Sequence, residues 1–127
     1  FGAPVASEDH ADRAVAAAIA MQQAQHELNE RWKPRGQPVF GLGIGLSTGL
    51  VAAALLGSEE RLEYTLVGDT VNLTQRLQQW AEPGETVVSE PTWAAMERMP
   101  EADKLAPAIV KGRDTPVAAY RFPRRAA

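Results

Sequence analysis

The sequence contains no cysteine, so neither a disulfide framework nor a thiolate metal site can form in it. A cysteine-free chain is typical of proteins that work in a reducing compartment. We therefore expect a cytoplasmic location for this domain. That expectation leaves room for a membrane anchor elsewhere in a longer protein.

Long apolar runs are also missing. The alanine-rich stretch from Ala14 to Met21 is too short to cross a bilayer and lies in a helix with a polar face, so we expect no membrane contact by this domain. An excess of basic residues is missing as well, since 13 Lys and Arg stand against 16 Asp and Glu, for a formal net charge of −3. A charge of this sign does not attract a nucleic-acid backbone, and we expect no nucleic-acid partner.

The length of 127 residues and an apolar content of 45% suit a single domain with a real hydrophobic core. The first residue is Phe1 rather than methionine, and no signal-peptide pattern follows it. The sequence therefore reads as a piece excised from a longer protein.

Hydrophobic periodicity predicts strands that alternate with helices. Helices are expected at 11–31, from Thr70 as far as the break at Pro83, and at 91–96. Strands are expected at 39–47, 50–56, 62–67, 86–89, 105–110 and 117–122. Gly49 is expected to close a tight hairpin between the first two strands. Alternation of this kind predicts an α/β sandwich.

One segment, residues 63–77, carries polar groups in a pattern that suits chemistry. It reads as a short apolar strand, a Gly-Asp turn and a helix that the Thr70 hydroxyl caps. Asn72 and Arg76 are four residues apart and share a helix face, separate from the apolar one. A guanidinium meets a phosphate with a fork of donors and a permanent charge. The pair predicts a phosphate site, and an ordinary exposed Arg with a helix-start Asn is the structural alternative.

Residues 63–76, Glu-Tyr-Thr-Leu-Val-Gly-Asp-Thr-Val-Asn-Leu-Thr-Gln-Arg, resemble a segment of the catalytic domain of class III nucleotide cyclases, the adenylyl and guanylyl cyclases. Supporting matches are Phe-Gly-Ala-Pro at 1–4, Glu-Asp-His-Ala at 8–11, Gly-Ile-Gly-Leu-Ser-Thr-Gly at 43–49 and Val-Lys-Gly at 110–112. They follow the family's order and approximate spacing. The resemblance implies that residues 1–127 are a cyclase catalytic domain with a ferredoxin-like α+β sandwich fold, truncated at the N-terminus to roughly the C-terminal two-thirds to three-quarters of the family domain.

The resemblance also implies an activity, namely conversion of ATP to 3′,5′-cyclic AMP and pyrophosphate at a dimer interface with two Mg²⁺ or Mn²⁺ ions. Asn72 is implied to orient the ribose, and Arg76 to stabilise the α-phosphate in the transition state. Thr65 is implied to read the purine edge, where a hydroxyl can accept from the adenine amino group. Lys111 is implied to contact the leaving phosphates. The implied partner is a second copy or another cyclase domain.

In the family, two metal-binding Asp residues and a purine-selecting Lys lie upstream of the position of Phe1. We therefore expect no metal ligand in this sequence and no activity from these 127 residues alone. Glu8, Asp9, His10 and Asp12 match no recognised ligand spacing and are interpreted as a helix cap and a solvated face. Asp69 is interpreted as a turn residue.

Three alternating glycines at 41, 43 and 45 leave one strand face without side chains, which allows close approach of another element or a ligand. They do not form a phosphate loop, because the further Gly and the Gly-Lys pair of such loops are missing. Many relatives place an Arg that helps hold the triphosphate where Gly43 stands. This difference favours the alternative of a non-catalytic or truncated module that dimerises or binds nucleotide, and a guanylyl cyclase is a further alternative.

Overall fold

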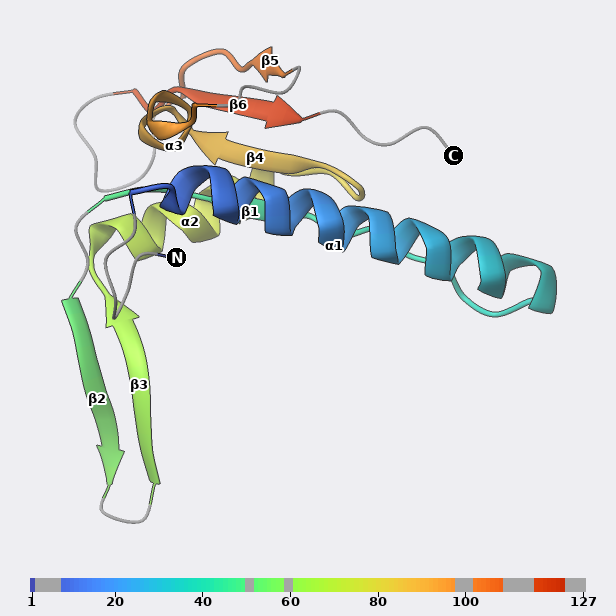
Figure 1. Cartoon of the computed structure of the whole chain (residues 1–127), viewed down its shortest axis with the longest axis horizontal. Helices are drawn as coiled ribbons and strands as arrows, with labels where there is room; N and C mark the ends of the chain where they lie inside the picture. The colour runs from blue at the N-terminus through green and yellow to red at the C-terminus, as the bar shows by residue number, and fades with distance from the viewer. Residues whose placement is uncertain (2–7, 50–51, 59–60, 98–101, 109–115, 123–127) are drawn as a thin grey trace.

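The computed structural model describes residues 1, 8–49, 52–58, 61–97, 102–108 and 116–122, and it gives the strands at 52–58 and 61–67 as backbone. Its helices are α1 (His10–Trp32), the 3₁₀ helix η1 (Lys33–Arg35), α2 (Asp69–Trp80) and α3 (Glu90–Ala95). Its strands are β1 (Ile44–Leu46), β2 (Ala52–Ser58), β3 (Arg61–Val67), β4 (Thr86–Ser89), β5 (Asp103–Lys104) and β6 (Ala119–Phe122). Figure 1 shows an α/β body from which β2 and β3 extend together.

Four strands form a sheet in the order β1-β4-β6-β5, in which β1 is parallel to β4 and the other neighbours are antiparallel. A parallel pair needs a crossover connection, and α2 provides it. Strands β2 and β3 form a separate antiparallel hairpin, so the prediction of a hairpin at Gly49 is wrong. A Cβ at Gly49 would lie 2.4 Å from Thr70 Oγ1, which shows that the chain there lies against the start of α2 instead of turning back.

Strand β1 is shorter than the predicted strand at 39–47. The chain before it lies along α1, where side chains take the place of a strand partner. Asn29 Nδ2 donates to the Phe40 carbonyl at 2.6 Å, and the Phe40 N–H donates back to Asn29 Oδ1 at 3.3 Å. Gln22 Nε2 donates to the Leu42 carbonyl at 3.0 Å. These bonds satisfy backbone groups that a ladder would otherwise use.

The predicted strand at 105–110 also differs from the structure. Strand β5 lies earlier, at Asp103–Lys104, and only an isolated bridge between Ala108 and Val117 follows it within the described residues. Pro107 lies between these two pairings and has no N–H to donate to a ladder. Residues 109 and 110 lie outside the described part of the chain.

The sheet has a hydrophobic core on each face. One core joins α2 to the sheet through Leu73, Leu77, Val87, Val117 and Ala119. The other joins α1 and the residue after α3 to the sheet through Ala11, Val15, Val88, Met96 and Phe122. Val87 and Val88 are consecutive in β4, so their side chains point to opposite faces. Helix α2 therefore covers one face and α1 the other, and the predicted α/β sandwich is confirmed.

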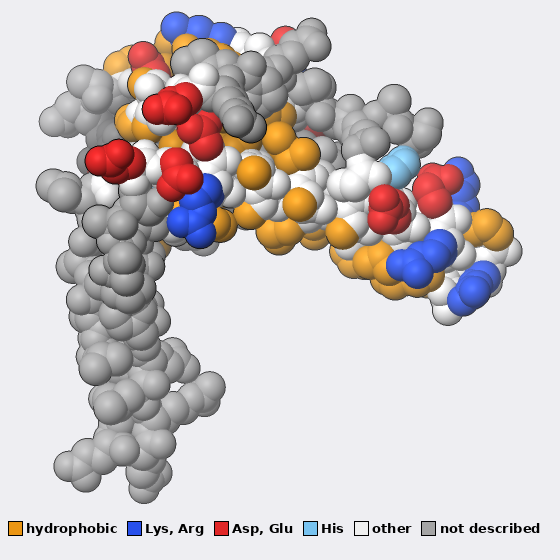
Figure 2. Space-filling model, in the orientation of Figure 1, with side chains coloured by type: hydrophobic (Ala, Val, Ile, Leu, Met, Phe, Trp, Pro, Cys, Tyr) orange, Lys and Arg blue, Asp and Glu red, His pale blue; other side chains and the backbone are white. Residues whose placement is uncertain are grey.

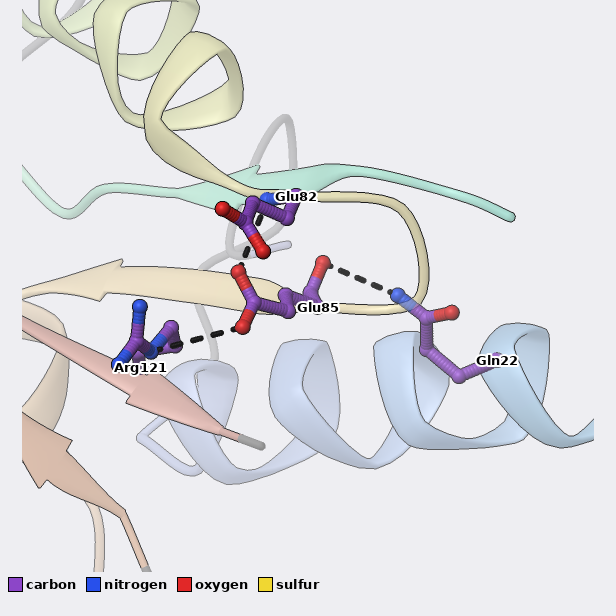
Figure 3. Close-up of polar contacts among 4 residues, drawn as sticks. All are labelled: Gln22, Glu82, Glu85 and Arg121. Carbon is purple, nitrogen blue, oxygen red and sulfur yellow. Dashed lines mark hydrogen bonds and ion pairs between the residues drawn. The ribbon is translucent and has the colours of Figure 1, made fainter. Parts of the chain in front are cut away.

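Polar contacts fix α1 to the sheet near the start of β4 (Figure 3). Gln22 Nε2 donates to the Glu85 carbonyl at 3.1 Å, in addition to its bond with Leu42. Glu85 is buried, with only 6% of the residue exposed. Its carboxylate accepts from the Glu82 N–H at 2.9 Å and pairs with Arg121 Nε at 3.5 Å. These bonds tie together α1, the loop after α2, and β6.

The surface of α1 is divided between apolar and charged side chains. Figure 2 shows apolar side chains along the helix and charged ones gathered toward its C-terminal end. The exposed large apolar residues in and just after α1 are Ile19, Met21, Val39 and Phe40, each about half exposed.

Within the described ranges, no helix combines the length and the apolar character that crossing a lipid bilayer requires.

Candidate active site

Helix α2 lies directly on β1 because the strand presents glycine to it. A Cβ at Gly45 would lie 2.4 Å from the backbone N of Gln78 and 2.8 Å from the Thr74 carbonyl. A Cβ at Gly43 would lie 3.1 Å from the Ala81 carbonyl, just after the helix. The predicted close approach to the glycine face is confirmed, and the element that fills the space is α2.

A turn at Gly68 connects β3 to α2. Gly68 is the N-cap of the helix and has a φ of 145°, a conformation that favours glycine. Its carbonyl accepts from the Val71 N–H at 3.1 Å, which begins the helix at Asp69. The turn at Gly68 is confirmed, but Asp69, interpreted as a turn residue, is the first residue of α2. The predicted cap by Thr70 is wrong, because the N-cap is Gly68 and Thr70 lies inside the first turn of the helix.

Three polar groups join the end of β1 to the first turns of α2. Ser47 Oγ donates to the Thr70 carbonyl at 3.0 Å, and Thr74 Oγ1 donates to the same carbonyl at 2.7 Å. The Ser47 and Thr74 hydroxyls also contact each other. We call this contact of Ser47 with Thr70 and Thr74 the seam, and the sequence did not predict it. The sequence signal for this contact was a pair of threonines four residues apart in the helix, opposite a strand that carries glycine at position 45.

Asn72 and Arg76 lie on the outer side of α2. Leu73 and Leu77 between and beside them are buried against the sheet, while Asn72 and Arg76 are both exposed. Because Asn72 and Arg76 are four residues apart in a helix, their Cβ atoms are about 5–6 Å from each other. Arg76 Nη1 donates to Gln79 Oε1 at 3.1 Å along the same helix. The structure thus brings the predicted pair together on one solvent-facing surface, and it adds Gln79, which only the three-residue spacing from Arg76 could have indicated.

The two predicted substrate-binding residues are placed less completely. Thr65 lies in β3, opposite Ala54 and three residues before the turn that leads into α2. Its side chain is outside what the structure describes. Lys111 lies outside the described residues altogether, so its predicted contact with the leaving phosphates stays a prediction.

The described residues do not offer a divalent-metal site. No group of three or more His, Asp or Glu side chains comes together among them. Asp12 accepts the Glu97 N–H with both carboxylate oxygens, at 3.0 and 3.1 Å. Asp9 is the N-cap of α1, but its side chain does not cap, because its backbone (φ −96°, ψ 23°) is not extended as capping residues usually are. A guanidinium such as that of Arg76 does not coordinate a cation, so Arg76 is not itself a candidate metal ligand.

Comparison with known proteins places the chain in one family. Residues 1–122 match the family described as the adenylate and guanylate cyclase catalytic domain. Adenylate cyclase 1 of Rhizobium meliloti (strain 1021) is 34% identical over 122 residues, which cover 94% of this chain and 18% of the relative. The chain therefore belongs to the adenylate and guanylate cyclase catalytic domain family.

Solved structures agree with this assignment. The crystal structure of the guanylyl cyclase Cya2 has a TM-score of 0.88 and 34% identity, with 95% of this chain and 61% of that chain covered. The adenylyl cyclase CyaB from P. aeruginosa has a TM-score of 0.81 and 29% identity, with 95% and 63% covered. The predicted class III cyclase fold is confirmed. The chain spans less than a fifth of the Rhizobium cyclase and just over three-fifths of Cya2.

Proposed function

We propose that this domain converts ATP to 3′,5′-cyclic AMP and pyrophosphate, and that it supplies one side of a site formed with a second cyclase domain. The observation that carries the proposal is the exposure of Asn72 and Arg76 next to each other on α2, with the helix held from behind by β1. The same segment carries the resemblance to the family, and the residues around it supply the match to known cyclases.

The chemistry requires position and charge more than a reactive side chain. The ribose 3′-hydroxyl gives its proton to solvent water, and its oxygen forms a bond to the α-phosphorus while the bond to the bridging oxygen of pyrophosphate breaks. Negative charge grows on the phosphate oxygens, and a guanidinium that donates to them lowers the barrier. Arg76 fits this role because it is exposed and always charged. The amide of Asn72, one helical turn away, fits the role of holding the ribose.

The proposal places the two divalent ions, Mg²⁺ or Mn²⁺, on carboxylates outside the described residues. When bound, such ions neutralise phosphate charge. A site of that kind needs a second domain or a further segment, which agrees with the exposed surface of α2. The half-exposed apolar residues Ile19, Met21, Val39 and Phe40 also favour association, since apolar groups in contact with water gain from burial. A homodimer would have two equivalent sites.

The choice of purine rests on Thr65 and on the relatives. A hydroxyl can accept from the adenine amino group, and the Rhizobium and P. aeruginosa relatives are adenylate cyclases. The second candidate, a guanylyl cyclase, is favoured by the likeness to Cya2. Turnover of the full-length protein with ATP and with GTP separates the two, and we expect kcat/KM to be higher for ATP.

Replacement of Arg76 tests the proposed catalytic surface. In the full-length protein we expect Arg76→Ala to lower kcat about 100-fold or more with a modest change in KM, because the interaction strengthens mainly in the transition state. Asn72→Ala should behave similarly. Arg35→Ala is the matched control, since Arg35 is an exposed arginine in η1, outside α2. A rate for Arg76→Ala within twofold of wild type would contradict the assignment.

The alternative of a non-catalytic module has one observation in its favour. Gly43 stands where the family resemblance implies an Arg that holds the triphosphate, and the Gly43 backbone lies against the end of α2. If the full-length protein binds ATP but makes no cyclic nucleotide with either metal, the catalytic proposal fails and the binding module is the better account.

The proposal also includes the domain bounds. Residues 1–127 are taken as part of one cyclase catalytic domain, and the chain covers about three-fifths of the solved cyclase chains.

A further inference from the structure

Two consecutive hydroxyl residues just after β1 contact two different helices, α2 and α3. Ser47 contacts α2 through the Thr70 carbonyl and Thr74, as described above. Thr48, the next residue, contacts Thr92 of α3 through a hydroxyl pair 2.7 Å apart. Thr92 also contacts Ser89 at 3.0 Å, at the start of α3. The same strand end therefore anchors one helix on each side, through bonds of the same chemical kind.

The hydrogen bond of Ser47 to α2 is directional, whereas the contact of Gly45 with the same helix is not. Gly45 presents no side chain to α2, so van der Waals contact there sets distance but leaves little to oppose rotation of the helix. Thr74 Oγ1 donates to the Thr70 carbonyl four residues earlier, which holds the Thr74 side chain in one rotamer. Ser47 therefore meets two oxygens whose positions are fixed on the helix.

We infer that Ser47 is a positioning residue for the reaction, because its hydroxyl fixes the rotation of α2 and with it the placement of Asn72 and Arg76. This inference rests on the proposed function. Thr70 and Thr74 lie on the side of α2 that meets β1, while Asn72 and Arg76 are exposed. Any rotation that the seam permits is passed to the exposed side chains, because a helix turns as a rigid unit.

The size of the effect follows from helix geometry. Side chains reach about 5–6 Å from a helix axis, so a rotation of about 10° moves their ends by about 1 Å. A displacement of that size at a reacting centre costs about 100-fold in rate. Loss of one anchoring hydroxyl permits part of such a rotation, since the apolar side of α2 remains packed through Leu73 and Leu77. We expect a loss of about tenfold in kcat for Ser47→Ala.

Steady-state kinetics of the full-length protein with ATP and Mg²⁺ or Mn²⁺ test the inference. Ser47→Ala should lower kcat about tenfold and leave KM within about twofold, because the helix still offers the same groups to bound substrate. Thr74→Val should lower kcat by a smaller factor, because Ser47 still donates to the Thr70 carbonyl. Thr74→Ser keeps the hydroxyl and should keep kcat. The double variant Ser47→Ala with Thr74→Val should be little slower than Ser47→Ala alone, because the contact of Thr74 with the end of β1 is the one with Ser47.

Thr48→Ala is the matched control. It removes the neighbouring hydroxyl and its bond to Thr92, yet it should leave kcat within about twofold, because that bond anchors α3. Equal losses of kcat in Thr48→Ala and Ser47→Ala would overturn the inference, since the effect would then be general loosening of β1. Unchanged kcat in Ser47→Ala would overturn it directly.

Hydrogen exchange separates this inference from the proposed function. Ser47→Ala should speed amide exchange in residues 71–76 of α2, and Thr48→Ala should not, because Ser47 bonds to α2 whereas Thr48 bonds to Thr92 of α3. A wild-type protein with no cyclase activity would overturn the proposed function and the catalytic role of the seam together. Unchanged exchange in α2 of Ser47→Ala would overturn the anchoring role, whatever the activity.

Discussion

Gly45→Ala tests the contact that holds α2 in place. The added Cβ would lie 2.4 Å from the Gln78 backbone N, 2.8 Å from the Thr74 carbonyl and 2.9 Å from the Gln78 Cα. Ordinary contact begins at 3.4 Å, so β1 and α2 would have to separate by about 1 Å. All three atoms are helix backbone, which cannot swing aside as the end of a long side chain can.

Two opposing effects determine how much Gly45→Ala changes the free energy of unfolding. Overpacking a close contact costs about 1–3 kcal/mol, and rigid backbone on both sides places this substitution near the upper end. Replacing glycine in a strand returns about 0.5–1 kcal/mol through the lower entropy of the unfolded chain. We therefore expect the free energy of unfolding to fall by about 2 kcal/mol. With a urea m-value of about 1.5 kcal/mol/M, the unfolding midpoint should fall by about 1.3 M.

Urea unfolding followed by circular dichroism measures this shift, and Gly43→Ala is the control. Gly43 lies two residues earlier on the same face, but its added Cβ would meet only the Ala81 carbonyl closely, at 3.1 Å, with other atoms at 3.6 Å. We expect Gly43→Ala to change the free energy of unfolding by less than about 0.5 kcal/mol. An equal midpoint for Gly45→Ala and Gly43→Ala, at an unchanged m-value, would refute the argument that β1 and α2 touch through glycine.

Two further predictions concern the isolated 127-residue chain. It should make no cyclic AMP with Mg²⁺ or Mn²⁺, because the part of the chain that the structure describes brings no carboxylate cluster together for the metals; metal-dependent product from a purified sample, detected by mass spectrometry, would contradict this. The chain should sediment as a dimer or larger species at tens of micromolar, because β1 lies at an edge of the described sheet and exposed edges recruit other chains. A strict monomer at about that concentration would count against an interface through this domain.

Local sequence patterns were sufficient for the parts of the site that depend on a single helix or turn. A period of 3.6 residues places Asn72 and Arg76 away from Leu73 and Leu77, and the structure shows the first two exposed and the others buried. The Gly-Asp pair predicts the turn before α2, since Gly68 adopts a φ that other residues avoid. The roles of Thr65 and Lys111 are not tested, because the side chain of the first and the whole of the second lie outside the described residues.

Only the tertiary structure decided which elements meet. Gly49 is typical of a hairpin turn, yet the chain at that point lies against Thr70, and the hairpin forms between β2 and β3. The predicted Thr70 cap is wrong because Gly68 is the N-cap of α2 and Thr70 lies within its first turn. There the Thr70 carbonyl accepts the hydroxyl of Ser47, 23 residues away in sequence and just after β1. Side-chain period and turn propensity act over a few residues, whereas strand pairing and the seam between Ser47 and α2 depend on which surfaces bury the most apolar area together.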